Sequence, residues 1–292
     1  MKSKVAWSCT MLISFQKMHG TMNDFVVFHD PVGRIELSAE QVVRVCNRRL
    51  GVGADGIIVI RPSNNADFFM DYVNSDGSSA EMCGNGIRCM AKYAYDSGLT
   101  DKTTLAIETR AGIKVLEIFT GADGKVNRVQ VNMGSPLFHP KDIPTIIDSG
   151  HVPIVDYPIE VQGQAFLASM VSMGNPHCVI VVDGEIGPLP KLYGASIETH
   201  PLFPAKTNVE FVRVVDRRVL LMRVWERGSG ETFSCGTGAC AAAVTTTLKG
   251  LTDSQVIVQL VGGDLTIAWK GDNADVFMIG PATTVYNGNI TI

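Results

Sequence analysis

The sequence lacks the features that would place it at once in several common functional classes. No apolar run is long enough to span a bilayer, and no block of Lys and Arg stands out in a chain with a formal net charge of −4. We therefore expect neither a membrane nor a nucleic acid as a partner. No Cys-x-x-Cys pair occurs, which argues against a structural zinc site, and we expect no bound metal.

A nucleotide-binding motif is also missing, although one stretch resembles it. The run GVGADG at residues 51–56 has the letters of a dinucleotide fingerprint, but such a fingerprint follows a strand and opens a helix. Here SAEQVVRVCNRRLG predicts a helix over 38–51, with Ser38 as its N-cap and Gly51 as its end, and GIIVI then predicts a strand. We expect no nucleotide and no other cofactor.

The composition indicates an ordered protein with reduced thiols. Hydrophobic residues make up 46 % of the 292 residues and charged ones 18 %, which suffices for one large domain or two ordinary ones. The seven cysteines are an odd number, and the opening MKSKVAWSCTMLISF lacks the cleavage site of an export signal. We expect a cytoplasmic protein without disulfides, in which residues 1–10 form a disordered extension.

Two of the cysteines stand at the predicted starts of helices. Cys83 opens CGNGIRCMAKYAYDSG and Cys235 opens CGTGACAAAVTTTLKG. A helix N-terminus carries free N–H groups and partial positive charge, so it lowers the pKa of a thiol and attracts an anion. Glycines beside it let a ligand approach the backbone. We expect the other cysteines to be small buried hydrophobes.

The two motifs belong to an internal repeat. Cys235 follows Cys83 by 152 residues (235 − 83 = 152), and Asn175 follows Asn23 by the same interval (175 − 23 = 152). A constant offset predicts a duplicated domain. We expect an α/β (α+β) fold with two similar, pseudo-twofold-related domains, residues 11–134 and 135–280, separated before a Pro-rich stretch that reaches about residue 160. Residues 281–292 would return to the first domain as a strand.

Two thiols facing each other across a cleft suggest the inversion of a stereocentre. A thiolate on one face of a substrate α-carbon removes the proton, and the thiol on the other face supplies a new one. Two helix N-termini would bind the carboxylate and stabilise the developing charge. Such chemistry demands no pyridoxal cofactor.

The motifs together resemble the diaminopimelate epimerase family. The matching stretches are KMHGTMNDF, NSDGSSAEMCGNGIRC, MGNPH, TNVEFV and WERGSGETFSCGTGACAAA, and they cover residues 15 to about 245. The resemblance implies an isomerase that converts LL-2,6-diaminopimelate to the meso isomer for lysine and cell-wall precursor synthesis. It also implies that each domain is a β-sheet wrapped around a central helix, with the active site in the cleft between them.

The resemblance assigns roles to individual residues. Cys83 and Cys235 would be the catalytic acid and base, and His177 with Glu226 would tune their pKa values. Arg227 would pair with the distal carboxylate and Glu226 would receive an ammonium group. The full set of substrate-binding residues would be Asn23, Asn74, Gly84, Asn85, Asn175, Asn208, Glu226, Arg227, Gly236 and Thr237. Two positions depart from the family: Met22 replaces a usual glycine, and Gly56 stands where many members have glutamine.

Several alternatives stay open. A racemase or epimerase of the same fold could act on another amino acid, although a monocarboxylate would leave Arg227 unpaired. A thiol-redox or binding protein of this fold could use the two cysteines without catalysis. The sequence decides neither between a monomer and a homodimer nor which cysteine is the thiolate at rest.

Overall fold

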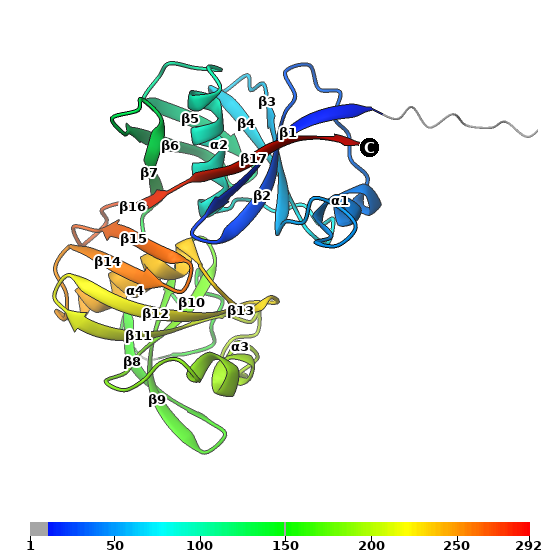
Figure 1. Ribbon diagram of the computed structural model, residues 1–292. Coiled ribbons are helices and arrows are strands. Elements are labelled where there is room, and N and C mark those ends of the chain that lie inside the picture. Colours follow the sequence, from blue (N-terminus) through cyan, green and yellow to red (C-terminus); the bar gives the residue numbers. More distant parts are fainter. Residues whose placement is uncertain (1–10, 149) are drawn as a thin grey trace, which may run out of the picture.

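A computed structural model describes residues 11–148 and 150–292, so the predicted extension at 1–10 lies outside the described residues. Figure 1 shows two halves, each with one helix lying within curved strands: α2 (Gly84–Asp96) in the first half and α4 (Gly236–Leu248) in the second. Both helices are buried along most of their length. The strands of each half bury their apolar faces against these helices.

The strands of the first half form both parallel and antiparallel pairs. Neighbours β1 and β2 form an antiparallel hairpin, β2 and β3 are parallel, and β3 and β4 are antiparallel. The strands are β1 (Leu12–Gly20), β2 (Asn23–His29), β3 (Gly56–Arg61), β4 (Phe68–Asn74), β5 (Thr104–Thr109), β6 (Gly112–Thr120) and β7 (Val126–Gly134).

The second half repeats this pairing, with parallel β10 and β11 followed by antiparallel β11 and β12. Its first strands are β8 (Ile154–Val161), β9 (Gln164–Ser172), β10 (Pro176–Val181), β11 (Asn208–Asp216), β12 (Val219–Glu226) and β13 (Gly230–Thr232). The later strands are β14 (Gln255–Leu260), β15 (Gly263–Ala268), β16 (Val276–Pro281) and β17 (Thr283–Thr291). A short π-helical turn, Pro190–Gly194, leads into α3 (Ala195–Glu198).

The offset of 152 residues holds from β1 to the end of α2, whereas the later equivalent strands β5 and β14 begin 151 residues apart (255 − 104 = 151). The 152-residue offset carries Gly84–Asp96 onto Gly236–Leu248 and Leu12–Gly20 onto Gln164–Ser172. It also preserves register, since Phe25 pairs with Gly56 and His177 pairs with Asn208. Sequence duplication is thus matched by structural duplication.

The two halves are joined by strand pairing. Antiparallel β7 and β16 occupy equivalent places in the repeat and hydrogen-bond to each other. The chain then crosses back, because β17 pairs antiparallel with β1 in the first half, as the red strand in Figure 1 shows. The predicted boundary after residue 134 falls at the end of β7.

Capping explains where the helices begin and end. Ser38 forms a capping box with Gln41 at the start of α1 (Ala39–Cys46), as expected. The expected end at Gly51 was wrong, because the Asn47 side chain accepts hydrogen bonds from the N–H groups of Arg49 and Leu50 and turns the chain earlier.

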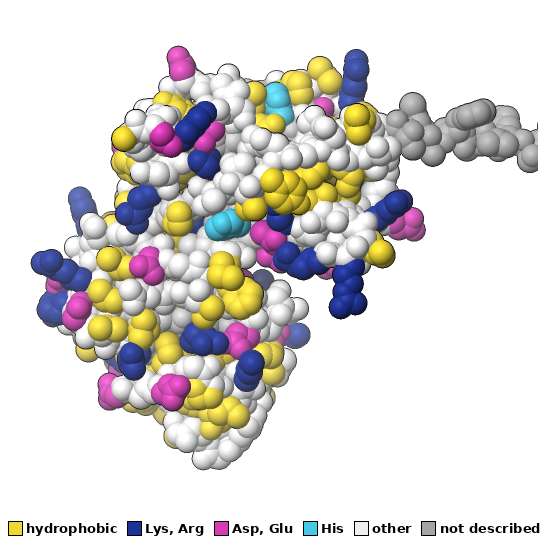
Figure 2. All heavy atoms as spheres, in the orientation of Figure 1, with side chains coloured by type: hydrophobic (Ala, Val, Ile, Leu, Met, Phe, Trp, Pro, Cys, Tyr) yellow, Lys and Arg dark blue, Asp and Glu magenta, His cyan; other side chains and the backbone are white. Residues whose placement is uncertain are grey.

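The distribution of charged side chains on the surface agrees with the small formal net charge of −4. Figure 2 shows acidic and basic side chains interspersed over both halves on this face. In the described part of the chain, no helix is both long and apolar enough to cross a membrane. The cysteines at positions 46, 89, 178 and 240 are buried, as expected.

Candidate active site

A cleft of about 880 Å³ lies between the halves and contains both helix-start cysteines. Its lining includes most of the residues named from the sequence. These are Asn23, Asn74, Cys83, Gly84, Asn85, Asn175, Glu226, Cys235, Gly236 and Thr237. His177, Asn208 and Arg227 are not on the lining.

Each cysteine is the N-cap of its helix. Cys83 and Cys235 have extended backbones, and their Sγ atoms accept hydrogen bonds from Gly86 N and Gly238 N at 3.4 Å each. The helix starts lie close together, since a Cβ on Gly236 would be 3.9 Å from the Gly84 Cα. Two thiols and two sets of free N–H groups therefore face the same cleft.

The expected lowering of the thiol pKa values is not found. Burial raises the pKa of Cys83, and the Glu226 carboxylate adds to this rise. Burial also raises the pKa of Cys235 well above its ordinary value, and the Glu226 and Glu210 carboxyl groups add to this rise where they are ionised. Hydrogen bonds from the helix N–H groups act in the opposite direction but do not outweigh the loss of water.

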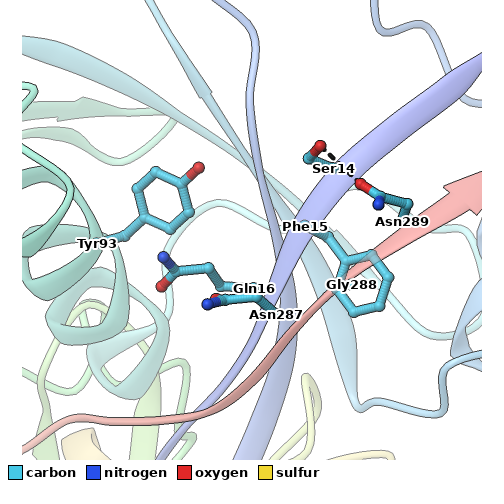
Figure 3. A pocket seen from close by; sticks show the side chains of 7 residues that line it. All are labelled: Ser14, Phe15, Gln16, Tyr93, Asn287, Gly288 and Asn289. Atoms are coloured by element: carbon cyan, nitrogen blue, oxygen red, sulfur yellow. Dashed lines mark hydrogen bonds between the residues drawn. The ribbon is translucent and has the colours of Figure 1, made fainter.

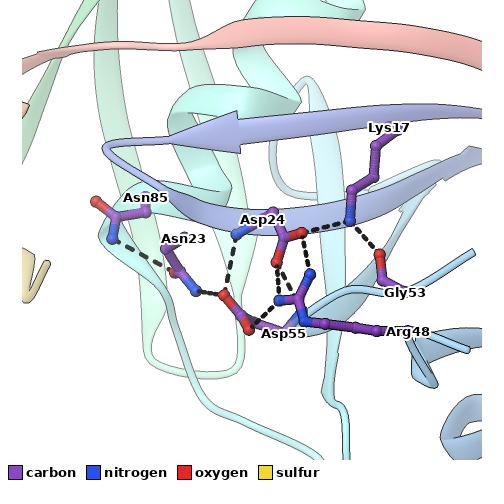
Figure 4. Close-up of polar contacts among 7 residues, drawn as sticks. All are labelled: Lys17, Asn23, Asp24, Arg48, Gly53, Asp55 and Asn85. Carbon is purple, nitrogen blue, oxygen red and sulfur yellow. Dashed lines mark hydrogen bonds and ion pairs between the residues drawn. The ribbon is translucent and has the colours of Figure 1, made fainter. Parts of the chain in front are cut away.

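An ionic network orients the groups around Cys83 (Figure 4). Asn23 Oδ1 accepts from Cys83 Sγ at 3.5 Å, and Asn23 Nδ2 donates to Asp55 at 2.9 Å. Arg48 bonds both Asp55 and Asp24, at 2.8 Å each. Hydrogen bonds of this kind fix which end of the Asn23 amide points to the thiol.

Asp24 anchors this network. Burial alone would raise its pKa, but hydrogen bonds from Arg48 and Lys17 outweigh burial and hold the pKa well below its usual range. Lys17 is itself largely buried and also donates to the Gly53 carbonyl. The ion pair therefore satisfies charges that would be costly to bury alone.

A different network lies behind Cys235. Thr237 Oγ1 is 3.5 Å from Cys235 Sγ, and Asn175 Nδ2 donates to Thr237 Oγ1 at 3.3 Å. Asn175 Oδ1 is 3.0 Å from His177 Nε2. His177 Nδ1 contacts Glu210 at 2.7 Å, and the role of His177 with Glu226 in tuning the thiols stays a prediction.

Glu226, at the end of β12, contacts the neighbouring strand β13. Its carboxylate accepts from the Thr232 hydroxyl, and burial raises its pKa. It lines the cleft together with both thiols, and its negative charge contributes to the raised pKa of each thiol. An ammonium group entering there would gain a carboxylate partner.

Asn208 and Arg227 do not line the cleft and are bonded to other groups. Asn208 Nδ2 donates to the Pro176 carbonyl at 2.8 Å, and its Oδ1 accepts from Arg227 N at 2.9 Å. The Arg227 guanidinium donates to the Ala205 carbonyl at 3.2 Å. Their binding roles stay predictions that require a change of position.

The two departures from the family have local explanations. Met22 adopts φ 65°, the left-handed region that glycine enters freely, and still delivers Asn23 to the cleft. At Gly56, a Cβ would lie 2.6 Å from the Tyr72 ring and 2.7 Å from the Val73 carbonyl. The Tyr72 ring thus fills the space that a glutamine side chain would need.

Sequence reasoning missed four residues of these networks: Asp24, Arg48, Asp55 and Glu210. The repeat could not find them, because the residues 152 places from Asp24, Asp55 and Glu210 are Pro176, Thr207 and Ile58. A usable signal was present for Glu210. It is a charged residue between Val209 and Phe211 in a predicted buried strand, where an unpaired charge is not tolerated.

A second hollow, of about 290 Å³, lies over the β1–β17 pair (Figure 3). Its lining consists of Ser14, Phe15, Gln16, Tyr93, Asn287, Gly288 and Asn289. Ser14 donates to Asn289 across it at 2.7 Å. It contains none of the residues predicted for the site.

Solved structures with low sequence identity share the fold. A hydroxyproline epimerase from Agrobacterium vitis is 16 % identical, with a TM-score of 0.68 over 96 % of this chain and 91 % of that one. A phenazine biosynthesis protein of the PhzF family from Bacillus anthracis is 18 % identical, with a TM-score of 0.68 over 97 % of this chain and all of that one. The predicted two-domain α/β fold is confirmed.

Curated relatives are much closer in sequence. Diaminopimelate epimerase from Acetivibrio thermocellus is 47 % identical over 279 residues, covering 95 % of this chain and 98 % of the relative. The same enzyme from Methanococcus maripaludis is 47 % identical over 281 residues, covering 96 % of this chain and all of the relative. These relatives confirm the prediction of an isomerase.

The family described as diaminopimelate epimerase matches residues 15–139 and 169–285. These two ranges include both cysteine motifs, both loop asparagines and the Glu226-Arg227 pair. The resemblance inferred from the motifs is thereby confirmed. The chain belongs to the diaminopimelate epimerase family.

Proposed function

We propose that this protein converts LL-2,6-diaminopimelate to meso-diaminopimelate with Cys83 and Cys235 as its two acid/base groups. The observation that carries the proposal is the placement of both thiols at adjacent helix N-termini in one cleft. The names of the relatives supply the substrate. The proposal includes a role in lysine and cell-wall precursor synthesis, in the cytoplasm.

The substrate carboxylate next to the reacting carbon would bind the N–H groups at the starts of α2 and α4. Gly84, Asn85, Gly236 and Thr237 begin these helices, and such N–H groups have no partner within a helix. The α-carbon would then lie between the two Sγ atoms. Asn23, Asn74 and Asn175 would hold the polar groups of the substrate around it.

One thiolate breaks the Cα–H bond and takes the proton onto sulfur. The electron pair moves into the carboxylate, whose growing negative charge is stabilised by the two helix N-termini. The opposite thiol gives its proton to the other face of the carbon and becomes a thiolate. Configuration inverts, no electrons are transferred, and the two cysteines have exchanged protonation states.

The raised thiol pKa values suit a switch that operates on binding. Burial and Glu226 disfavour the thiolate at both positions. A substrate brings ammonium groups, and a positive charge near a thiol favours its ionised form. We expect the ammonium group to pair with Glu226 and so to remove the carboxylate's effect on the thiols.

The distal end of the substrate would be bound by Arg227 and Asn208. Both lie outside the cleft lining, so the proposal requires that the halves close and bring them inward. A substrate with an amino acid group at each end gives Arg227 a carboxylate partner. A homodimer would be compatible with this scheme, since both cysteines come from one chain.

The test is solvent deuterium uptake. Reduced protein is incubated with LL-diaminopimelate in D₂O without added cofactor, while NMR follows the α-proton and chiral chromatography follows the isomers. Exchange together with the meso isomer supports the proposal. If no deuterium exchanges into this substrate but exchange occurs with another amino acid, such as a proline derivative, the protein would be a different racemase of the same fold. Silence with a broad amino acid panel would favour a redox or binding role.

A further inference from the structure

A continuous chain of polar contacts runs from Glu210 on β11 to the thiol of Cys235. Glu210 Oε1 is 2.7 Å from His177 Nδ1, and His177 Nε2 is 3.0 Å from Asn175 Oδ1. Asn175 Nδ2 lies 3.3 Å from Thr237 Oγ1, which is 3.5 Å from Cys235 Sγ. Glu210 therefore stands four contacts from the reacting sulfur.

The donors and acceptors in this chain determine where its protons lie. Asn175 donates its amide N–H to Thr237, so it presents only its carbonyl oxygen to His177. His177 Nε2 must therefore carry a proton. The Nδ1 contact to Glu210 then needs a second proton, on the nitrogen or on the carboxyl oxygen, because two acceptors do not bond. The pair contains one proton more than a neutral histidine beside a carboxylate.

Burial supports a pair without net charge. The side chains of His177 and Glu210 are both completely buried, and Glu210 Oε2 has no hydrogen-bond partner among the residues that the structure describes. A full negative charge with one bare oxygen would be costly away from water. The other charged group facing Cys235 is Glu226 on β12.

The fold itself does not require this polar pair. In the duplicated half, Phe25 and Ile58 occupy the places of His177 and Glu210 (177 − 25 = 152 and 210 − 58 = 152), and both are fully buried. The spatial match is close: a Cβ on Gly86 would meet Ile58 Cδ1 at 2.9 Å, and a Cβ on the equivalent Gly238 would meet Glu210 Oε1 at 2.7 Å. An apolar pair fills the same space, and such pairs often stabilise as well as buried ionic ones.

We propose that Glu210 is a positioning residue that shares one proton with His177 and, through Asn175 and Thr237, directs a hydroxyl donor at Cys235. Thr237 accepts from Asn175 and keeps its single O–H, which is the group that can bond the sulfur once Cys235 is ionised, because a thiolate only accepts. The Cys83 side has the opposite polarity, since Asn23 presents its carbonyl oxygen to that thiol. The catalytic importance of Cys235 rests on the proposed function. The proton shared by His177 and Glu210 and the contacts that lead from them to Cys235 do not depend on it.

The proton is tested by ¹⁵N NMR of His177 in the full-length protein, assigned with His177→Phe. We expect a protonated Nε2 in the wild type and in Glu210→Gln, whose amide N–H can replace the shared proton. A protonated Nδ1 beside a bare Nε2 would mean that the Asn175 amide is turned around. That result would overturn the proposal.

Positioning is tested by the rate of iodoacetamide labelling at Cys235 relative to Cys83, measured by peptide mass spectrometry. The key variant is His177→Phe/Glu210→Ile, which transfers the apolar pair of the first half. We expect Cys235 to react about tenfold more slowly relative to Cys83, because its thiolate loses a donor. An unchanged ratio in folded protein would contradict the proposal.

Glu210→Gln distinguishes the effect of the contact with His177 from the effect of a negative charge on Glu210. It keeps the contact to His177, so the labelling ratio should stay within about twofold of wild type. A strong increase at Cys235 would show that Glu210 carries an uncompensated negative charge, against the proposal. Glu108→Gln is the matched control, since Glu108 is half-buried in the first half and bonds Ser63 and Asn65 instead. No readout here requires diaminopimelate turnover, so an error in the proposed function would show only in the deuterium experiment.

Discussion

Cys83 and Cys235 have the same cap geometry but different surroundings. Cys83 faces the Asn23 amide oxygen, which an ionic network holds, whereas Cys235 faces the Thr237 hydroxyl, which accepts from Asn175. An acceptor favours the protonated thiol and a donor favours the thiolate. The two half-reactions of an epimerase built on this site therefore need not have equal barriers.

Replacing either cysteine should abolish epimerisation. We expect Cys83→Ser and Cys235→Ser each to lower kcat by at least about 10³-fold, because a serine hydroxyl ionises far less readily and each face needs a proton handler. Chiral chromatography of the product measures the loss. The matched control is Cys89→Ser, since Cys89 is buried within α2 and does not line the cleft. A single variant that epimerises at a near wild-type rate would end the two-thiol account.

The Asp24 network should control stability in acid. Because the folded-state pKa of Asp24 is lowered, its stabilisation is complete above its unfolded pKa of about 4 and is lost as the pH falls through the folded value. Asp24→Asn should cost about 3 kcal/mol at pH 7, since it leaves Lys17 buried without its partner. The difference from wild type should shrink below about pH 4.

Urea unfolding at several pH values measures both effects. The comparison is Asp67→Asn, which removes an ion pair to the exposed Lys102 and should cost much less. A gap between wild type and Asp24→Asn that is constant from pH 7 to pH 3 would argue against this role of the carboxylate.

Among the elements, the central helices α2 and α4 are equivalent in the repeat, but their starts pack against different side chains. Gly86 and Gly238 are equivalent, and each donates its N–H to the capping thiol. A Cβ at Gly86 would press on a methyl group of Ile58, whereas at Gly238 it would press on the Glu210 carboxylate and lie 3.3 Å from Cys235 Sγ. The same substitution should therefore have different consequences.

We expect Gly238→Ala to lower kcat by about 10²-fold, because displacement of Glu210 and Cys235 disturbs the reacting geometry. Gly86→Ala should act mainly on stability, costing about 1–3 kcal/mol by overpacking the core around Ile58. Steady-state kinetics and urea unfolding of both variants separate the two effects. Equal kcat losses would refute the distinction.

Most elements could be predicted because their signals are local. The GIIVI strand, the Ser38 cap and the two Cys-Gly-x-Gly helix starts depend on neighbouring residues, and the structure has them where expected. β8 was missed, because it lies at the end of the Pro-rich stretch that suggests a domain boundary. Pro158 is tolerated there since β8 pairs with β9 alone in the described chain, which leaves one edge without ladder bonds.

The site could be predicted only in part, for the same reason. Residues within the two cysteine motifs were found, since their spacing brings them to a helix start. Arg48 and Asp55 act through contacts with Asp24 and Asn23, which lie on a different strand, and no sequence pattern joins them. Likewise, only the register of β10 beside β11 brings His177 to Glu210.

At the scale of the whole molecule, the strand pairings suggest where motion is permitted. The halves are joined by β7 with β16 and by the return of β17 to β1, while the cleft lies between the helix starts. We infer that residues 11–134 with 281–292 form one domain and 135–280 the other. Rotation about the β7–β16 joint could then narrow the cleft without breaking either core.

Closure should accompany substrate binding. A dry site strengthens the effect of the helix N-termini on the developing charge, and Arg227 and Asn208 must move to reach a substrate. We expect LL-diaminopimelate to decrease the radius of gyration of the Cys83→Ser/Cys235→Ser double variant, measured by small-angle X-ray scattering without turnover. Adding Arg227→Met should weaken binding and reduce this compaction, because the distal carboxylate would lose its partner. If calorimetry shows saturation while the scattering stays unchanged, the substrate binds to the open form, and Arg227 has no part in holding it.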